Sequence, residues 1–164
     1  MESVLMEHVQ AVDPTLVYRD GRWNLFFTQK DHPSVKLYRY VADDLKGPYR
    51  SHWANPIKVD CADARMAGAF FEWKGQMVRP AQECIRYYGT AVRLNRVEAL
   101  DEDQYEETQF DTIEPIKQSD YRKGLHTLNG NDQVTVIDGK RWLFTFSGMS
   151  HQIKEKANRR KEHV

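Results

Sequence analysis

The sequence predicts an all-β fold that forms part of a β-propeller, with about two to three blades of antiparallel strands. Three observations predict it: a hairpin pattern that occurs three times, a strand pattern that occurs twice between the hairpins, and a similar spacing for both. A period somewhat above fifty residues, with about four strands per unit, is typical of propeller blades. A β-sandwich is the competing fold, but its strands are not expected to repeat in order at this period.

Each predicted hairpin consists of an apolar run, a tight turn and a second apolar run. A two-residue turn between strands needs positive φ, which glycine adopts without steric cost. The three segments are residues 17–28 (VYRDGRWNLFFT), 70–82 (FFEWKGQMVRPAQ) and 135–147 (TVIDGKRWLFTFS). Their turns are expected at Asp20-Gly21, Lys74-Gly75 and Asp138-Gly139.

The second repeated element predicts a further strand after each of the first two hairpins. Residues 35–44 (VKLYRYVADD) and 92–101 (VRLNRVEALD) alternate apolar and charged side chains with period two, as strands with one face in solvent do. Turn-rich stretches between the strands predict loops at 46–48, 55–56 and 129–132. Helix is scarce: we expect a short helical turn at 101–107 and a helix at 153–162.

Composition excludes several classes of partner. Lysine and arginine number 24, as do aspartate and glutamate, so no global field attracts nucleic acid. No stretch reaches the length of a membrane-spanning helix, and the first residues do not resemble a secretory signal. We therefore expect one domain over residues 1–150, a basic tail over 151–164, and a cytoplasmic protein by default. Cys61 and Cys84 are expected to be reduced thiols, because their spacing suggests neither a zinc site nor a disulfide framework.

No metal or cofactor site is predicted. The six histidines are scattered without the spacing of metal ligands, and no glycine-rich cofactor loop occurs. Glycoside hydrolysis normally needs two carboxyl groups that flank the scissile bond, and no convincing pair stands out. Catalysis by this chain alone is therefore not expected.

A series of ordered motifs across residues 13–138 resembles one known family. The motifs are DDLKGP (43–48), ARMAG (64–68), VRPAQEC (78–84), YG (88–89) and GLHTL (124–128). Together they resemble the N-terminal propeller domain of glucosamine inositolphosphorylceramide transferases. The opening VDPTLVYRDGRWNLFFTQ (12–29) resembles five-bladed propellers related to glycoside hydrolase family 43. The sequence departs from the family pattern at Met66, where proline is expected, and at Glu83, where aspartate is usual.

The resemblance implies an incomplete five-bladed propeller that begins near the fourth blade. In the hydrolase relatives the catalytic carboxylates come from the first three blades, which this chain would lack. The function implied is a carbohydrate-binding or substrate-positioning segment that takes a carbohydrate or sugar-phosphate ligand. One alternative is a hydrolase or glycosyl-transfer component completed by another chain or by missing N-terminal blades. Another alternative is a structural protein-interaction module, because fold alone does not decide function.

The candidate binding residues follow from propeller geometry and from the motifs. The first strand of each blade lines the central channel, and the motifs add polar residues on or after the next strand. The candidates are Asp13, Arg65, Arg79, Gln82, Glu83, Tyr88 and His126. The arginines could clamp a phosphate, the histidine could transfer a proton, and the tyrosine could stack on a sugar. The alternative for each is structural: a turn cap at Asp13, ion pairs for the arginines, a hydrogen-bonded histidine and a packed tyrosine ring.

An incomplete propeller leaves strand edges without partners, and unpaired edges favour association. We therefore expect the purified chain to form homo-oligomers, to pair with a companion propeller chain, or to have poor solubility. Light scattering on the purified chain checks this, and a well-behaved dilute monomer contradicts it.

Overall fold

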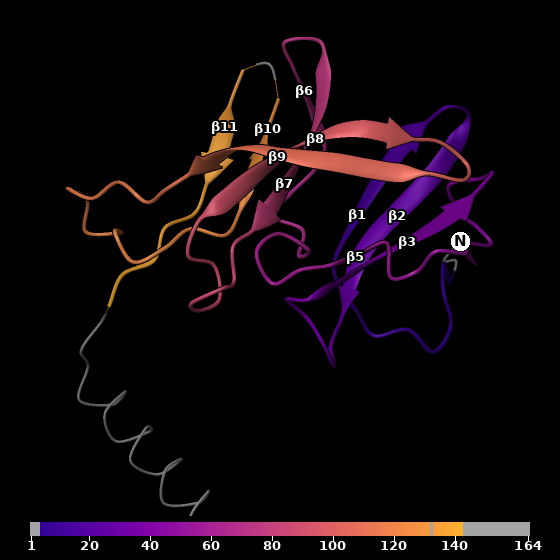
Figure 1. The fold of residues 1–164 in the computed structure, drawn as a ribbon, viewed down its shortest axis with the longest axis horizontal. Coiled ribbons are helices and arrows are strands. Elements are labelled where there is room, and N and C mark those ends of the chain that lie inside the picture. Colours follow the sequence, from indigo (N-terminus) through magenta and orange to yellow (C-terminus); the bar gives the residue numbers. More distant parts are fainter. Residues whose placement is uncertain (1–3, 132, 143–164) are drawn as a thin grey trace, which may run out of the picture.

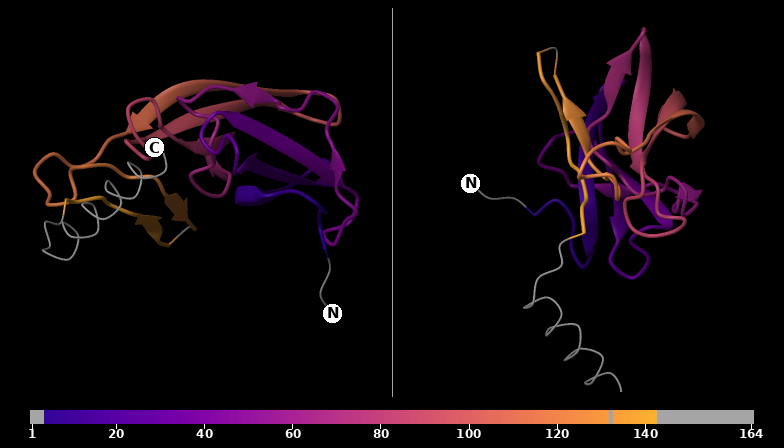
Figure 2. Two further views of the ribbon diagram at one scale, coloured as in Figure 1. Left: turned by 90° about the horizontal axis from the view of Figure 1, so that it is seen from below. Right: turned by 90° about the vertical axis from the view of Figure 1, so that its left-hand side faces the viewer.

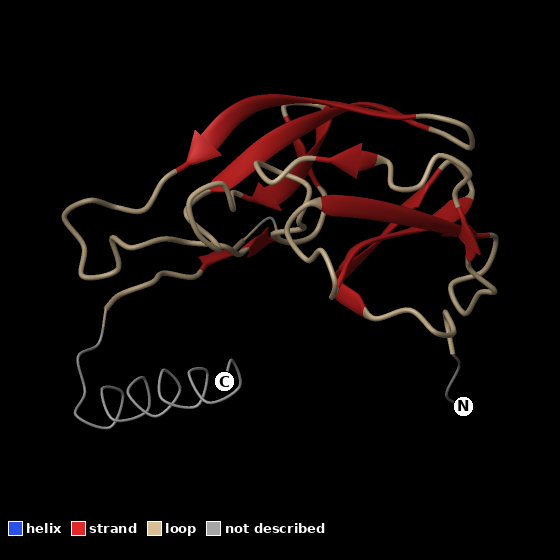
Figure 3. Cartoon of the chain, turned by 60° about the horizontal axis from the view of Figure 1, so that its bottom comes forward, coloured by secondary structure: helices blue, strands red, loops and turns tan. Residues whose placement is uncertain are grey.

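The protein is all-β, as the sequence predicts. The computed structural model describes residues 4–131 and 133–142, and within these ranges it contains strands, turns and loops but no helix (Figure 3). The strands form two larger antiparallel sheets and a two-stranded sheet (Figure 1). All three sheets are open, which is the arrangement of a partial, propeller-like β domain. The predicted basic tail lies outside the described residues.

The first sheet is an antiparallel meander with the order β1-β2-β3-β4, and β5 also pairs with β3. Its strands are β1 (Ala11–Arg19), β2 (Arg22–Gln29), β3 (Lys36–Ala42), β4 (Arg50–Ser51) and β5 (Lys58–Val59). The predicted Asp20-Gly21 turn joins β1 to β2, and both of its residues have positive φ (49° and 79°). The strand predicted from residues 35–44 is β3, paired with β2.

The second sheet repeats this plan with the order β6-β7-β8-β9. Its strands are β6 (Phe71–Trp73), β7 (Gln76–Gln82), β8 (Val92–Leu100) and β9 (Tyr105–Ile113). Lys74 and Gly75 form the turn between β6 and β7, again with two positive φ values (52° and 76°). Two of the three predicted hairpins and both predicted further strands are therefore confirmed.

The predicted helical turn at 101–107 is wrong. The Asp101 carboxylate accepts hydrogen bonds from the amides of Asp103 and Gln104, which closes a tight turn between β8 and β9. Residues from Tyr105 onward already belong to β9. Pairing with β8 thus takes these residues into the sheet.

The third predicted hairpin also differs in its turn. β11 (Thr135–Ile137) pairs with the preceding β10 (Leu128–Gly130), so Asn129 and Gly130 of the loop predicted at 129–132 belong to a strand. Gly139 does not have positive φ, and Lys140 instead forms a bridge to Arg122. The Asp138 carboxylate binds the amides of His126 and Thr127 rather than closing a turn. Residues 143–147 of this prediction lie outside the described residues.

An apolar core joins the two larger sheets. Phe26 of β2 is fully buried, with ring centroids 4.9 Å from Phe70 and 5.2 Å from Tyr105. The core also contains Leu37 and Met66, both nearly inaccessible. The long β8–β9 hairpin extends over the first sheet (Figure 2), which brings Tyr105 onto Phe26.

Two buried arginines reinforce this docking, one from each sheet. Arg39 of β3 donates to the Asn24 side chain at 2.8 Å and to the Gln104 carbonyl at 3.1 Å. It also donates to the Asp101 carbonyl, so the tip of the β8–β9 hairpin is anchored on the first sheet. Arg79 of β7 extends from the second sheet. Its guanidinium donates to the Asp63 carbonyl at 2.6 Å, in the segment that follows β5 of the first sheet.

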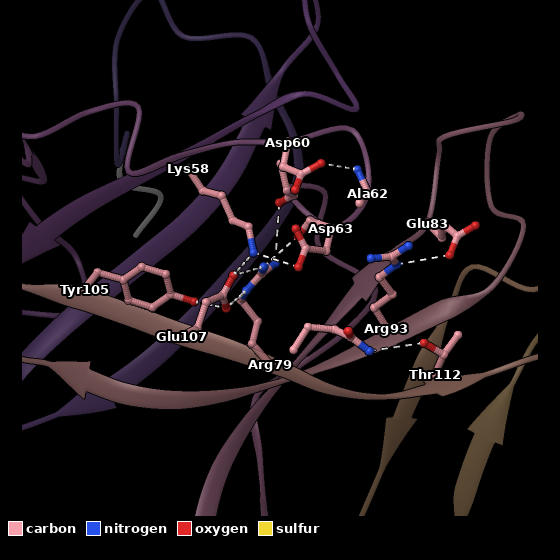
Figure 4. A network of polar contacts seen from close by, with 12 residues as sticks. Lys58, Asp60, Ala62, Asp63, Arg79, Glu83, Arg93, Tyr105, Glu107 and Thr112 are labelled. Atoms are coloured by element: carbon pink, nitrogen blue, oxygen red, sulfur yellow. Dashed lines mark hydrogen bonds and ion pairs between the residues drawn. The ribbon is translucent and has the colours of Figure 1, made fainter.

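Arg79 is the centre of a charged network between the sheets (Figure 4). Its guanidinium makes two bonds to the Glu107 carboxylate, of 2.7 and 2.5 Å. Lys58 of β5 contacts Glu107 at 2.6 Å and Asp63 at 2.7 Å, and the Tyr105 hydroxyl donates to Glu107 at 2.5 Å. Buried charges are stable only when paired, so the positions of these residues are mutually dependent.

The network controls the ionisation of its members. Burial alone favours neutral Glu107, yet Arg79 and Lys58 lower the pKa of this carboxyl to about 2. Burial likewise favours neutral Arg79, but the carboxylates of Glu107 and Asp63 outweigh this and raise its pKa. Burial raises the pKa of Tyr105 well above its usual value, so the hydroxyl stays a donor.

We predict that acid unfolds the protein partly through Glu107. A carboxyl whose pKa is lowered by folding stabilises the folded state above its unfolded pKa of 4.5, and this stabilisation decreases as pH falls toward 2. The contribution is about 3 kcal/mol. Urea unfolding between pH 7 and pH 2.5 checks it: Glu107→Gln should be less stable at pH 7 and lose less stability on acidification. Equal pH dependence in both proteins contradicts the prediction, and Glu106→Gln is the neighbouring exposed control.

Candidate ligand-binding site

A polar cleft of about 440 Å³ lies where the two sheets and the β10 segment meet. Its walls come from the start of β1, residues 66–69, the end of β7, the loop before β8, and residues 126–129. Four of the seven sequence candidates line it: Asp13, Gln82, Tyr88 and His126. A fifth, Arg65, bonds to Asp13 and lies over the Tyr88 ring. The fold thus brings together residues up to 113 positions apart (126 minus 13).

Asp13 has an unusual backbone. Its φ is 50°, and the pairing of β1 with β2 shifts register between Val12 and Thr15. A bulge of this kind bends a strand and redirects a side chain, and a non-glycine residue at positive φ stores strain. The Asp13 carboxylate consequently lines the cleft, where it accepts bonds from Arg65 Nε at 2.7 Å and Gln82 Nε2 at 2.9 Å. The Asp13 side chain remains 38% exposed.

Gln82 forms a buried side of the cleft, and only the nitrogen of its side-chain amide is hydrogen-bonded among the described residues. Its amide nitrogen donates to Asp13 and, at 2.7 Å, to the Met66 carbonyl. Its Oε1 atom has no hydrogen-bond partner among the described residues, although the side chain is almost completely buried. A buried acceptor without a donor is costly, and this oxygen has almost no accessible surface, so the part that Gln82 plays at the cleft is to hold Asp13 in place.

Tyr88 lies among cations. The Arg65 guanidinium is 4.6 Å and the Lys140 ammonium 4.4 Å from its ring centroid. The His126 ring packs edge-on, with centroids 5.0 Å apart. Burial raises the pKa of the Tyr88 hydroxyl, Arg65 opposes this rise, and Asp13 adds to it. The tyrosine is therefore a neutral hydrogen-bonding group at the cleft, with cations close to its ring.

His126 is oriented by an aspartate. Its Nδ1 contacts the Asp138 carboxylate, which also accepts the amides of His126 and Thr127, each at 2.7 Å. Burial favours neutral Asp138, but these amides and the histidine lower its pKa, so it stays a carboxylate. With Nδ1 engaged, Nε2 is the ring nitrogen left for a ligand, and an imidazole held in this way can accept or donate a proton.

Arg79 and Glu83 do not join the cleft. Arg79 has no exposed surface, and its guanidinium is bonded to Glu107 and to backbone carbonyls, so it forms an interior ion pair rather than a ligand clamp. Glu83 pairs with Arg93 at 3.0 Å (Figure 4). The motif that carries both residues thus supports the fold, and only its Gln82 reaches the cleft.

Local sequence does not indicate that Asp138 and Lys140 lie beside the site. For Asp138 it predicts a hairpin turn, because Asp-Gly between apolar runs is typical of one. Lys140 donates to the Tyr88 carbonyl from 52 positions away, and nothing in the local pattern indicates that contact. Among the described residues, no group of three histidine, cysteine or acidic side chains could hold a metal ion. The part of the chain that the structure describes also contains no helix long and apolar enough to cross a membrane.

Comparison with known proteins assigns the family. Residues 1–147 match the family model described as "Glucosamine inositolphosphorylceramide transferase 1, N-terminal". The chain belongs to this family. The chain is also similar to proteins named "Glucosamine inositolphosphorylceramide transferase 1": it is 32% identical over 137 residues to the one from Oryza sativa subsp. japonica and 28% identical over 138 residues to the one from Arabidopsis thaliana. The match covers 79% of this chain but only 18% and 17% of those relatives, and no solved structure matches.

The cleft of this transferase-family domain depends on a glycine at its wall. A Cβ atom on Gly68 would lie 1.9 Å from the Leu128 carbonyl oxygen. At this point the Leu128 amide, at the start of β10, donates a hydrogen bond to the Ala67 carbonyl at 2.9 Å. We predict that Gly68→Ala destabilises the protein by about 1–3 kcal/mol, because the backbone must separate. Urea unfolding measures it. The exposed neighbour gives the control: Ala69→Gly should cost no more than about 1 kcal/mol, and equal losses contradict the prediction.

Proposed function

We propose that this chain supplies a carbohydrate-binding or substrate-positioning site to a glycolipid-modifying transferase. The observation that carries the proposal is the cleft itself, in which Asp13, Gln82, Tyr88 and His126 converge. Hydroxyl-rich ligands need many fixed donors and acceptors, and these side chains are fixed by their neighbours. The curated relatives are named as transferases whose name contains glucosamine and an inositol phosphate group, which fits such a ligand.

The charges in and beside the cleft favour a ring that carries both hydroxyl groups and a phosphate. The Asp13 carboxylate, which is 38% exposed, is an acceptor for hydroxyl or ammonium groups. Arg65 and Lys140 lie beside the Tyr88 ring, and guanidinium and ammonium groups are the usual protein partners of phosphate. We therefore propose an inositol phosphate or sugar phosphate as the ligand class, with the rest of the transferase providing the chemistry.

A catalytic component is the second candidate, and the Asp138–His126 pair favours it. An imidazole held by a carboxylate is a general acid–base arrangement; His126 lines the cleft, and Asp13 supplies a carboxylate there. The alternative propeller relationship to glycoside hydrolase family 43, and the five-blade count, remain predictions. Neither is needed for binding.

We predict that the chain binds myo-inositol 1-phosphate in isothermal titration calorimetry and that Asp13→Asn weakens binding at least about tenfold, because a charged acceptor is lost. The matched control is Asp43→Asn, another exposed aspartate that pairs with arginines, outside the cleft. Glucosamine and inorganic phosphate titrated alone separate the ring and anion contributions. Absence of binding, or equal weakening by both variants, contradicts the proposal.

A further inference from the structure

The two cysteines, distant in sequence, are neighbours in the structure. Cys61 lies in the turn after β5 and Cys84 follows the end of β7. The amide of Cys84 donates a hydrogen bond to the carbonyl of Cys61 at 3.1 Å. Cys61 is exposed and Cys84 is partly so, and both are free thiols.

This backbone contact brings the two cysteines close to the separation that a disulfide requires. Residues that exchange two such bonds in an antiparallel ladder have Cα atoms about 5.5 Å apart, and the single bond between Cys84 and Cys61 places their backbones in a comparable range. Disulfides accept Cα separations of about 4.4–6.8 Å. Turns and loops surround both residues, so small backbone adjustments can complete the geometry. The exposure of Cys61 makes its sulfur accessible to a small oxidant.

We propose that Cys61 and Cys84 form a reversible intrachain disulfide that links the two larger sheets. With glutathione disulfide as the oxidant, the Cys61 thiolate attacks one sulfur of that disulfide, forming a mixed disulfide and releasing one glutathione thiolate. The Cys84 thiolate then attacks the Cys61 sulfur of the mixed disulfide and releases the second glutathione. Two protein thiols and one glutathione disulfide thus become one protein disulfide and two glutathione thiols.

The cross-link would join two segments that build the cleft. Cys61 precedes Arg65 in the segment after β5, and Cys84 begins the loop that carries Tyr88. This loop is closed at its base by bonds between Glu83 and residues 90 and 91. Arg65 and Tyr88 are in contact in the cleft, so oxidation would fix the separation of their two segments.

The proposed bond does not require that the cleft bind a sugar, so it and the proposed function can fail separately.

The experiment equilibrates the purified chain in glutathione buffers of increasing oxidised fraction, followed by maleimide trapping and non-reducing peptide mass spectrometry. We expect the two thiols of one chain to become unreactive together, with a Cys61–Cys84 peptide pair lighter by two hydrogen atoms and restored by dithiothreitol. Cys61→Ser and Cys84→Ser are matched controls that should each give only a glutathione adduct at the remaining thiol. Glutathione adducts on both cysteines of the native chain, disulfide-linked dimers, or thiols that stay reactive would each overturn the proposal.

Discussion

The buried Arg79–Glu107 ion pair is the interaction on which the rest of the structure depends. A buried guanidinium is tolerated only when its charge and donors are satisfied, and here Glu107 of β9 and the Asp63 carbonyl are its partners, while Lys58 of β5 pairs with the same Glu107. That turn leads directly to Arg65, which holds Asp13 at the cleft. The charge pair therefore orders the segment from which the binding site is built, although Arg79 itself never reaches the cleft.

The local elements follow from local chemistry. Asp20-Gly21 and Lys74-Gly75 turn because adjacent residues at positive φ match the twist of the strands they connect. The alternating segments after them become β3 and β8, but neither strand has the solvated face that the alternation predicts: β3 has no exposed residue, and its charged Arg39 is buried. Asp138-Gly139 has the same dipeptide signal but a different outcome, because the Asp138 carboxylate is bound by the His126 and Thr127 amides. A long-range partner overrides turn propensity there.

The site could be predicted only in part, and the reason is sequence distance. Asp13, Gln82, Tyr88 and His126 were recognisable as polar residues in apolar or motif-rich surroundings, and the fold brings them to one cleft. Arg79 had the same local appearance, but its partner Glu107 lies 28 positions away on another strand. The same limit applies to Cys61 and Cys84, whose spacing suggested no relation and whose backbones are hydrogen-bonded. Local sequence does not distinguish an interior ion pair from a ligand clamp.

The cleft exists only when the sheets are docked. Asp13 belongs to the first sheet, Gln82 to the second, and His126 to the segment before β10. A ligand that contacts all three would bind the docked arrangement and not the separated sheets, so its binding free energy would add to the free energy of folding. That binding free energy would compensate for the strained φ of Asp13, a cost of the docked arrangement that lines the cleft. Folding and the proposed ligand binding are therefore thermodynamically coupled, because only the docked sheets can bind the ligand.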